Sequence, residues 1–371
     1  MTKVCHMTSV HAPEDVRIFK KECVSLAEAG YETYLVEQGD SYEKDGVHII
    51  GVGAQENGRL ARIFKMSRRV YKEALKIDAD IYHFHDPELL PYGLKLKKKG
   101  KKVIFDSHEN TAISIKEKYY IPRFLRNFIY HCYRKYEERI CQYLDAVIYV
   151  SPNFVNDFSR LNKRIILLPN YPIVDKDNYR EPLENSDSII FAGLVIPTWS
   201  HENIIEAIKD IDSIKYTICG GVSDEYLSKL KKMPGWKKVD YKGRIPHEGV
   251  AKEMENSFIG VALMQPHLNS MGHQGTLGNT KVFEEMMAGL PVICTDFELW
   301  KPIIEENHCG ICVDPNDIMQ IHNAIVYLQN NREEARRMGK QGRRMVVEKY
   351  NWSVIKEDLL RLYEDIINAG E

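Results

Sequence analysis

The chain has 371 residues, of which 51 are Lys or Arg and 53 are Asp or Glu. A chain of this length exceeds one ordinary hydrophobic core and predicts two domains, each large enough to bury its own interior. The balanced charge provides no overall field that would attract nucleic acid or an anionic membrane, so we expect no nucleic-acid partner and only a local basic surface.

The expected location follows from the cysteines and the apolar runs. The 8 cysteines are scattered and mostly lie inside apolar runs, which is typical of reduced thiols and not of a disulfide framework. No apolar run reaches the ~20 residues needed to span a bilayer. We therefore expect a cytoplasmic protein, with any membrane contact being peripheral and on the cytoplasmic face.

The first half of the chain alternates short apolar runs with amphipathic segments, the pattern of a parallel sheet flanked by helices. Strands are predicted at 3–9, 31–38, 47–52, 81–85, 102–107, 146–151 and 165–168. Helices are predicted near 16–29, 58–77, 87–99 and 121–143.

Periodicity is lost over 167–188, where Pro, Asn, Asp and Ser gather as in an interdomain connection. A second alternation follows, with a last helix that has no strand partner. Its strands are predicted at 188–194, 215–220, 238–243, 258–264, 291–295 and 311–313, and its helices near 201–211, 224–232, 247–256, 279–288, 298–307, 316–330, 333–348 and 352–368. We place one Rossmann-like domain at 1–172 and another at 173–352, with the terminal helix in 353–371 returning to the first.

Polar side chains gather where strands of the first domain end, the edge at which α/β proteins bind ligands. They are His11, Asp15 and Arg17 after the first strand, His83, His85 and Asp86 in HFHD, and Asp106, His108 and Glu109 in FDSHE. Such residues could instead cap the following helices. Asp86, followed by a proline, suits a helix cap in particular.

The HFHD segment also raises the question of a metal site. His83 and His85 stand two residues apart on a predicted strand and therefore face the same way. With Asp86 beside them they could chelate zinc. From these residues alone, a metal-dependent hydrolase is an alternative.

In the second domain, the informative run is GTLGNTKVFEEMMAGLPVICTD (275–296). Gly278 and Asn279 precede a helix predicted to begin near Thr280, whose free amides and positive dipole end we expect to hold a phosphate, with Lys281 adding charge. Glu284 follows one turn later, positioned for a sugar or ribose hydroxyl. Glu284 and its neighbour Glu285 could equally form a solvated helix face.

The segment 116–143 interleaves Lys and Arg with Tyr, Phe, Ile and Leu. A basic aromatic helix of this kind can lie in a membrane interface. It could equally be a core helix whose basic side chains extend to the solvent.

In their order along the chain, these segments resemble the GT-B glycosyltransferases, specifically the retaining enzymes of glycosyltransferase family 4. HAPEDVRIFKKECVSLAEAGYETYLV resembles the opening strand, loop, helix and strand of that family, and HFHDPELL and FDSHE resemble two strand ends of a bacterial subset. TKVFEEMMAGLPVI resembles the donor-site helix, and YNWS the segment before the terminal helix. The resemblance implies an α/β protein with two Rossmann-like domains facing each other across a cleft.

The resemblance also implies roles for residues of this chain and a fold that needs neither a catalytic metal nor a cofactor. We expect His108 to support the transferring sugar and Asp15 to lie near the acceptor hydroxyl. The residues expected to line the acceptor site or cleft are His11, Arg17, His85, Asp86 and Glu109. The residues expected to bind the donor are Gly193, Arg244, Gly278, Asn279, Thr280, Lys281 and Glu284.

Two positions depart from the family pattern. The family commonly has two glutamates eight residues apart, but Thr276 stands eight residues before Glu284. Leu194 occupies the position of the usual arginine after the first strand of the second domain. We therefore assign neutralisation of the diphosphate to Lys281 and Arg244, by position alone.

Together these features predict a retaining hexosyltransferase with a nucleotide-diphosphate sugar as donor. Its expected acceptor is a glycan or a polyprenyl-linked lipid in the synthesis of bacterial surface polysaccharide. Two alternatives remain from the sequence: a GT-B sugar-nucleotide epimerase, which needs no acceptor, and less plausibly the metal-dependent hydrolase.

Overall fold

The computed structural model describes residues 1–54, 58, 61–118, 120–175 and 179–369. The chain forms two compact units, Met1–Asn170 with Ile355–Glu371, and Tyr171–Val354. The predicted α/β class is confirmed in both. The chain passes from the first unit to the second after residue 170, whereas the prediction was 172. It returns to the first unit after residue 354, whereas the prediction was 352.

The first unit is built on a sheet in the order β3-β4-β2-β1-β5-β6-β7-β8. Its strands are β1 Lys3–Met7, β2 Glu32–Glu37, β3 Tyr42–Lys44, β4 Val47–Gly51, β5 Ile81–Phe84, β6 Lys102–Ser107, β7 Ala146–Tyr149 and β8 Ile165–Leu167. All pair in parallel except β3, an additional strand that runs antiparallel to β4. Strands β5 and β7 are buried along their whole length, as in parallel sheets covered by helices on both faces.

Helices of the first unit cover the predicted segments, although not always with the predicted type. They are η1 Val16–Cys23, α1 Val24–Glu28, η2 Arg62–Met66, α3 Ser67–Ile77, η3 Pro87–Leu89, α4 Leu90–Lys98, α5 Thr111–Ser114, α6 Arg123–Cys141, η4 Pro152–Phe154 and α7 Val155–Phe158. Three of these, the short helices α5, η4 and α7, were not predicted. The helix predicted at 16–29 is a π-helix, η1, continued by α1. Part of the helix predicted from 58, residues 59–60, lies outside the described residues. None of the described helices combines the length and the apolar run needed to span a bilayer.

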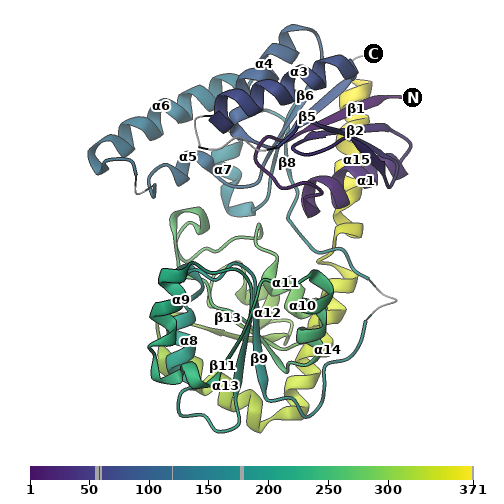
Figure 1. Cartoon of the computed structure of the whole chain (residues 1–371). Helices are drawn as coiled ribbons and strands as arrows, with labels where there is room; N and C mark the ends of the chain where they lie inside the picture. The colour runs from purple at the N-terminus through teal and green to yellow at the C-terminus, as the bar shows by residue number, and fades with distance from the viewer. Residues whose placement is uncertain (55–57, 59–60, 119, 176–178, 370–371) are drawn as a thin grey trace. The chain divides into compact units, whose positions relative to one another are not determined.

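The terminal helix α15, Trp352–Asn368, ends in the first unit, where Figure 1 shows it beside α1 and β2. Four of its side chains are buried there: Leu359, Leu362, Tyr363 and Ile366. The Tyr363 hydroxyl lies 2.8 Å from Nδ1 of His83 and 3.1 Å from Nε2 of His6. The helix therefore contributes both apolar packing and a polar contact to the centre of the first unit.

The second unit repeats the doubly wound pattern with a parallel sheet in the order β11-β10-β9-β12-β13-β14. Its strands are β9 Ser188–Ala192, β10 Lys215–Cys219, β11 Val239–Gly243, β12 Ile259–Ala262, β13 Val292–Thr295 and β14 Gly310–Val313. Its helices are η5 Pro197–Trp199, α8 His201–Ile208, α9 Asp224–Lys231, η6 Pro234–Lys238, α10 His247–Glu255, η7 Leu268–Ser270, α11 Lys281–Met287, α12 Lys301–Ile304, α13 Ile318–Asn330 and α14 Arg332–Glu348. Helix α8 packs with α13, and α11 packs with α14 (Figure 1).

One helix prediction in the second unit is wrong. The segment 298–307 was expected to be a single helix, but α12 covers only Lys301–Ile304. The backbone then turns, because His308 adopts a left-handed conformation with φ of 52° and the Cys309 amide donates to the Ile304 carbonyl. This turn feeds the chain directly into β14.

Both sheets reverse their strand order at one point, which is where α/β proteins bind ligands at the carboxyl ends of the strands. In the first unit the reversal lies between β1 and β5, and in the second between β9 and β12. The segments that follow these strands are therefore the first places to look for a site.

Ile366 tests whether α15 holds the first unit together. Ile366→Ala should lower the free energy of unfolding by about 2–5 kcal/mol, because it removes a fully buried side chain from a packed core. Glu364→Ala, two residues away on the exposed side of the same helix, should change it by less than about 0.5 kcal/mol. Denaturant unfolding of both variants would measure the difference, and equal effects would contradict the packing role of α15.

Candidate functional site

A pocket of about 600 Å³ lies at the carboxyl ends of β1, β5 and β6 in the first unit. Its lining includes five of the seven site residues predicted for this domain, namely His11, His85, Asp86, His108 and Glu109. Ser107, Lys118 and Tyr120 also line it and were not predicted. The other two predicted residues, Asp15 and Arg17, do not belong to the lining.

His108 is the partly exposed member of a chain of polar contacts. Its Nε2 lies 3.2 Å from Oδ2 of Asp106 and 3.2 Å from Nδ1 of His85. About 20% of the His108 side chain is exposed, whereas Asp106 is fully buried. The His11 ring packs on it with a centroid distance of 4.7 Å. A buried carboxylate therefore orients the imidazole that the pocket exposes.

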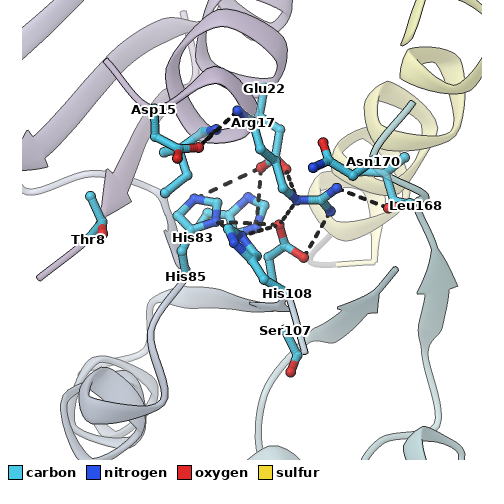
Figure 2. Close-up of polar contacts among 12 residues, drawn as sticks. Thr8, Asp15, Arg17, Glu22, His83, His85, Ser107, His108, Leu168 and Asn170 are labelled. Carbon is cyan, nitrogen blue, oxygen red and sulfur yellow. Dashed lines mark hydrogen bonds and ion pairs between the residues drawn. The ribbon is translucent and has the colours of Figure 1, made fainter. Parts of the chain in front are cut away.

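Arg17 is the buried counter-ion of Asp106. Its guanidinium donates two hydrogen bonds to the carboxylate, of 2.8 and 3.0 Å, and a third of 3.1 Å to the carbonyl of Leu168 (Figure 2). Burial raises the pKa of Asp106, but Arg17 and His108 outweigh burial and hold the pKa well below its usual range. Arg17 was expected to line the cleft. It is buried instead and acts on the pocket through Asp106.

Asp86 does not cap the helix that follows it. Its Oδ2 accepts hydrogen bonds from the hydroxyl of Thr8 at 2.9 Å and from the backbone and hydroxyl of Ser9, and its Oδ1 lies 3.5 Å from Nε2 of His11. The carboxylate thus ties the segment after β5 to the segment after β1. The alternative of a simple helix cap is wrong for this residue.

Asp15 does have a capping role. Its Oδ1 accepts hydrogen bonds from the amides of Arg17 and Ile18 at the start of η1. Its Oδ2 lies 3.4 Å from Nδ1 of His11. Partial burial lowers the pKa of His11, but Asp15 and Asp86 outweigh it, so the pKa is raised and the ring carries more positive charge.

Four further groups lie together beneath the pocket: His6, Glu22, His83 and His85. The Oε2 atom of Glu22 lies 4.0 Å from Nδ1 of His6, 3.8 Å from Nε2 of His83 and 3.9 Å from Nε2 of His85. Burial lowers the pKa of His6 and His83 well below the usual range and that of His85 to about 4, so the three rings are neutral. His83, one of the polar residues of the HFHD segment, is completely buried.

Sequence reasoning missed His6 and Glu22. His6 stands in register with His83 on the neighbouring strand, and Glu22 projects from η1. The only signal for His6 in the sequence is a histidine inside an apolar strand, and strand register cannot be read from such a strand alone.

In the second unit, Lys281 reaches the end of β9. A Cβ built on Gly193 would lie 2.2 Å from the Lys281 ammonium, so the lysine occupies the space that this glycine leaves open. The ammonium also lies 5.4 Å from the ring centre of Phe191 and 5.2 Å from that of Trp199. Gly193 has φ of 152°, in the region that favours glycine. These contacts place a positive charge at the strand reversal.

The remaining predicted donor residues surround the start of α11. Thr280 is the residue before this helix, and Asn279 accepts a hydrogen bond of 3.0 Å from the Lys281 amide. One of the amides expected to hold a phosphate is therefore already bonded. Gly278 precedes them, with its amide bonded to the Thr276 hydroxyl at 3.0 Å. Thr276, which replaces the expected glutamate, thus shapes this loop.

Glu284 and Glu285 differ more than expected. Glu284 is half-buried, but Glu285 is buried against Gly260, and burial raises its pKa well above the usual range. The alternative that the two glutamates form a solvated helix face is therefore wrong for Glu285. Arg244 follows the edge strand β11 and is exposed.

Two family models match the chain, and the boundary between them lies close to the boundary between the two units. Residues 20–171 match the family model described as Glycosyltransferase Family 4, and residues 175–345 match the model described as Glycosyl transferases group 1. An uncharacterized glycosyltransferase of Methanocaldococcus jannaschii is 22% identical over 320 residues, which is 81% of this chain and 79% of that protein.

Two solved structures share the fold over almost the whole chain. Sucrose-phosphate synthase from Thermosynechococcus elongatus is 17% identical, with a TM-score of 0.76 and coverage of 100% of both chains. Anabaena HepE, solved in complex with UDP-glucose, is 11% identical, with a TM-score of 0.73 and coverage of 98% of this chain and 100% of the other. With one family model matching each unit and this shared fold, the chain is a GT-B glycosyltransferase of the family 4 type.

Proposed function

We propose that the protein transfers a hexose, with retention of anomeric configuration, from a nucleotide-diphosphate sugar to a glycan or polyprenyl-linked acceptor. The observation that carries this proposal is His108, which a buried Asp106–Arg17 pair orients at the pocket of the first unit. The pocket receives the transferring sugar and the acceptor. The second unit binds the nucleotide.

Asp106 sets the hydrogen bonding of the His108 ring. When Nε2 of His108 donates its hydrogen to the Asp106 carboxylate, Nδ1 is left as a hydrogen-bond acceptor. An acceptor nitrogen suits a sugar hydroxyl, and the carboxylate behind the ring favours positive charge developing on the sugar. Fixed groups of this kind stabilise a transition state without the cost of reorganising them.

Asp15 acts in this proposal as a positioning residue. It does not line the pocket, but it holds His11, which does. His11, whose pKa Asp15 and Asp86 raise, is then available to an acceptor hydroxyl or to the phosphate of a lipid-linked acceptor. Glu109 and Asp86 complete the polar wall of the pocket.

On the donor side, Lys281 neutralises the diphosphate beside Gly193, and Glu284 holds the ribose. The Anabaena neighbour bound to UDP-glucose supports a nucleotide-sugar donor for this fold. Arg244 supplies a second positive charge, after the carboxyl end of β11 in the same sheet. Because side chains provide this charge, we propose that the transfer step needs no metal ion and no cofactor.

The acceptor proposal rests on α6 and its surroundings. Phe124 and Phe128 are 82% and 67% exposed, and the cations Arg123, Lys135 and Arg139 are exposed on the same helix. A second pocket, of about 660 Å³ between α4 and α6, is lined by basic and aromatic side chains. These features fit peripheral contact with anionic lipid at the cytoplasmic face of a bacterial membrane, where surface polysaccharides are begun.

His108→Ala should cut kcat by roughly a hundredfold, a rise in the barrier of about 2.7 kcal/mol, because the interaction strengthens as charge develops on the sugar. Affinity for the nucleotide diphosphate should change little. Steady-state kinetics with calorimetry would measure both, and Asp106→Asn should reproduce part of the loss in kcat. Near-normal turnover in His108→Ala would contradict the assignment.

Glu284→Ala should weaken binding of the nucleotide diphosphate by about 1–3 kcal/mol, the value of a hydrogen bond to a charged group. Glu285 is unsuitable as a control because it is buried. Glu333→Ala, at an exposed position of α14, is the matched control and should leave affinity unchanged. Isothermal titration calorimetry would measure the difference, and equal affinities for the Glu284 and Glu333 variants would rule out the ribose contact.

For membrane contact, the triple change of Arg123, Lys135 and Arg139 to Gln should lower partitioning onto anionic vesicles by more than about tenfold, since each cation near anionic lipid contributes on the order of 1 kcal/mol. Arg134 is left unchanged because it is buried in ion pairs with Glu137, Glu138 and Asp157.

The control for this experiment is the pair Lys340→Gln and Arg344→Gln, exposed cations of α14 in the second unit. Co-sedimentation at low salt is the measurement. Partitioning that falls equally in the control, or that does not fall in the triple variant, would favour a helix without a membrane role.

A further inference from the structure

The cluster beneath the pocket joins segments that lie far apart in the sequence. His6 belongs to β1, Glu22 to η1, and His83 and His85 to β5 and the residue after it. We propose that these four side chains form a binding site for one divalent transition-metal ion, with zinc favoured. The ion would be structural and would take no part in sugar transfer.

The positions of the ligand atoms fit one ion. In a tetrahedral zinc site with bonds of about 2.0–2.1 Å, neighbouring ligand atoms lie ~3.3 Å apart. Here His6 Nδ1 and His85 Nε2 are 3.0 Å apart, and Glu22 Oε2 lies 3.8–4.0 Å from the three ring nitrogens. All four groups lie within 4.8 Å of one another. Pairs of ligand atoms would have to approach each other by up to about 1.5 Å to reach tetrahedral spacing.

The cluster also contains buried polar atoms that protein groups do not satisfy. Among the residues that the structure describes, Oε2 of Glu22 and Nε2 of His83 have no hydrogen-bond partner, whereas Oε1 of Glu22 lies 3.2 Å from Nε of Arg17. These side chains have no exposed surface. Leaving such groups unpaired is costly, and a bound cation would satisfy both atoms at once.

The outer nitrogens of the rings have the partners that metal-bound histidines usually have. His83 Nδ1 and His6 Nε2 both face the Tyr363 hydroxyl of α15, at 2.8 and 3.1 Å. His85 Nδ1 lies 3.4 Å from Oδ2 of Asp106. When each outer nitrogen carries the hydrogen, each inner nitrogen presents a lone pair to the ion.

The charges favour a cation over an empty cluster. Glu22 and Asp106 are two buried carboxylates that share one buried guanidinium, that of Arg17, whose Nε lies 3.2 Å from Oε1 of Glu22 and 2.8 Å from Oδ2 of Asp106. A divalent ion would compensate the carboxylate charge that the single guanidinium leaves unbalanced. Three imidazoles and one carboxylate are the ligand types that zinc prefers. Since every ligand is buried, the site has no position open to substrate, which argues against the metal-dependent hydrolase that the HFHD segment left as an alternative.

The test is the metal content of the intact protein, expressed with zinc in the medium and purified without a metal-affinity tag. We expect elemental mass spectrometry to find about one zinc ion per chain. The ion should be retained through dialysis against EDTA and released when the chain unfolds. Protein produced with cobalt should show the visible absorption bands of tetrahedral Co²⁺. Neither measurement uses donor or acceptor, so failure here is distinguishable from failure of the proposed transfer.

Two variants locate the ion. Glu22→Gln keeps the shape of the side chain but not its charge, and His83→Phe keeps a buried ring; both should bind about tenfold less metal and melt at lower temperature. His201→Phe is the matched control, because His201 is equally buried and bonded to Tyr216 in the second unit. Folded wild-type protein with less than about a tenth of an ion per chain would overturn the proposal. Metal content equal in all variants would overturn it too.

Discussion

The buried ion pair between Arg17 and Asp106 is the interaction on which the first unit's site depends. Asp106 is the next-to-last residue of β6 and lies close to His85 and His108. Arg17 comes from η1 and also donates a hydrogen bond to the carbonyl of Leu168, the residue after β8. Three separate segments are thereby fixed around one carboxylate. Removing either charge would leave its partner buried without compensation, at a cost of about 3–5 kcal/mol. We therefore ascribe to the pair a role in positioning His108 more than a net contribution to stability.

The two units share an architecture but place different side chains at the strand reversal. Both reverse strand order once, and both place their distinctive side chains after the strands at that point. The first unit collects histidines and carboxylates, which suit sugar hydroxyls and a developing positive charge. The second places Lys281 against Gly193, which suits a diphosphate. Each half of the chain is also matched by its own family model.

Much of the fold could be predicted because strands that are buried on both faces appear in the sequence as short apolar runs, and helices as amphipathic ones. The site was harder, since it depends on register and burial. HFHD and FDSHE identified the strand ends, but nothing in the sequence shows that His6 stands beside His83 or that Arg17 turns inward. Glu285 shows the same limit: adjacent glutamates look alike in sequence, and only packing against Gly260 distinguishes them.

The most direct measurement of the central claim is release of nucleotide diphosphate from a panel of nucleotide sugars, in EDTA, with and without lipid-linked acceptors. The account predicts that one donor is turned over, that release requires an acceptor, and that the product keeps the anomeric configuration of the donor. Turnover without any acceptor, as an epimerase would give, would contradict the account. So would an absolute requirement for an added metal ion.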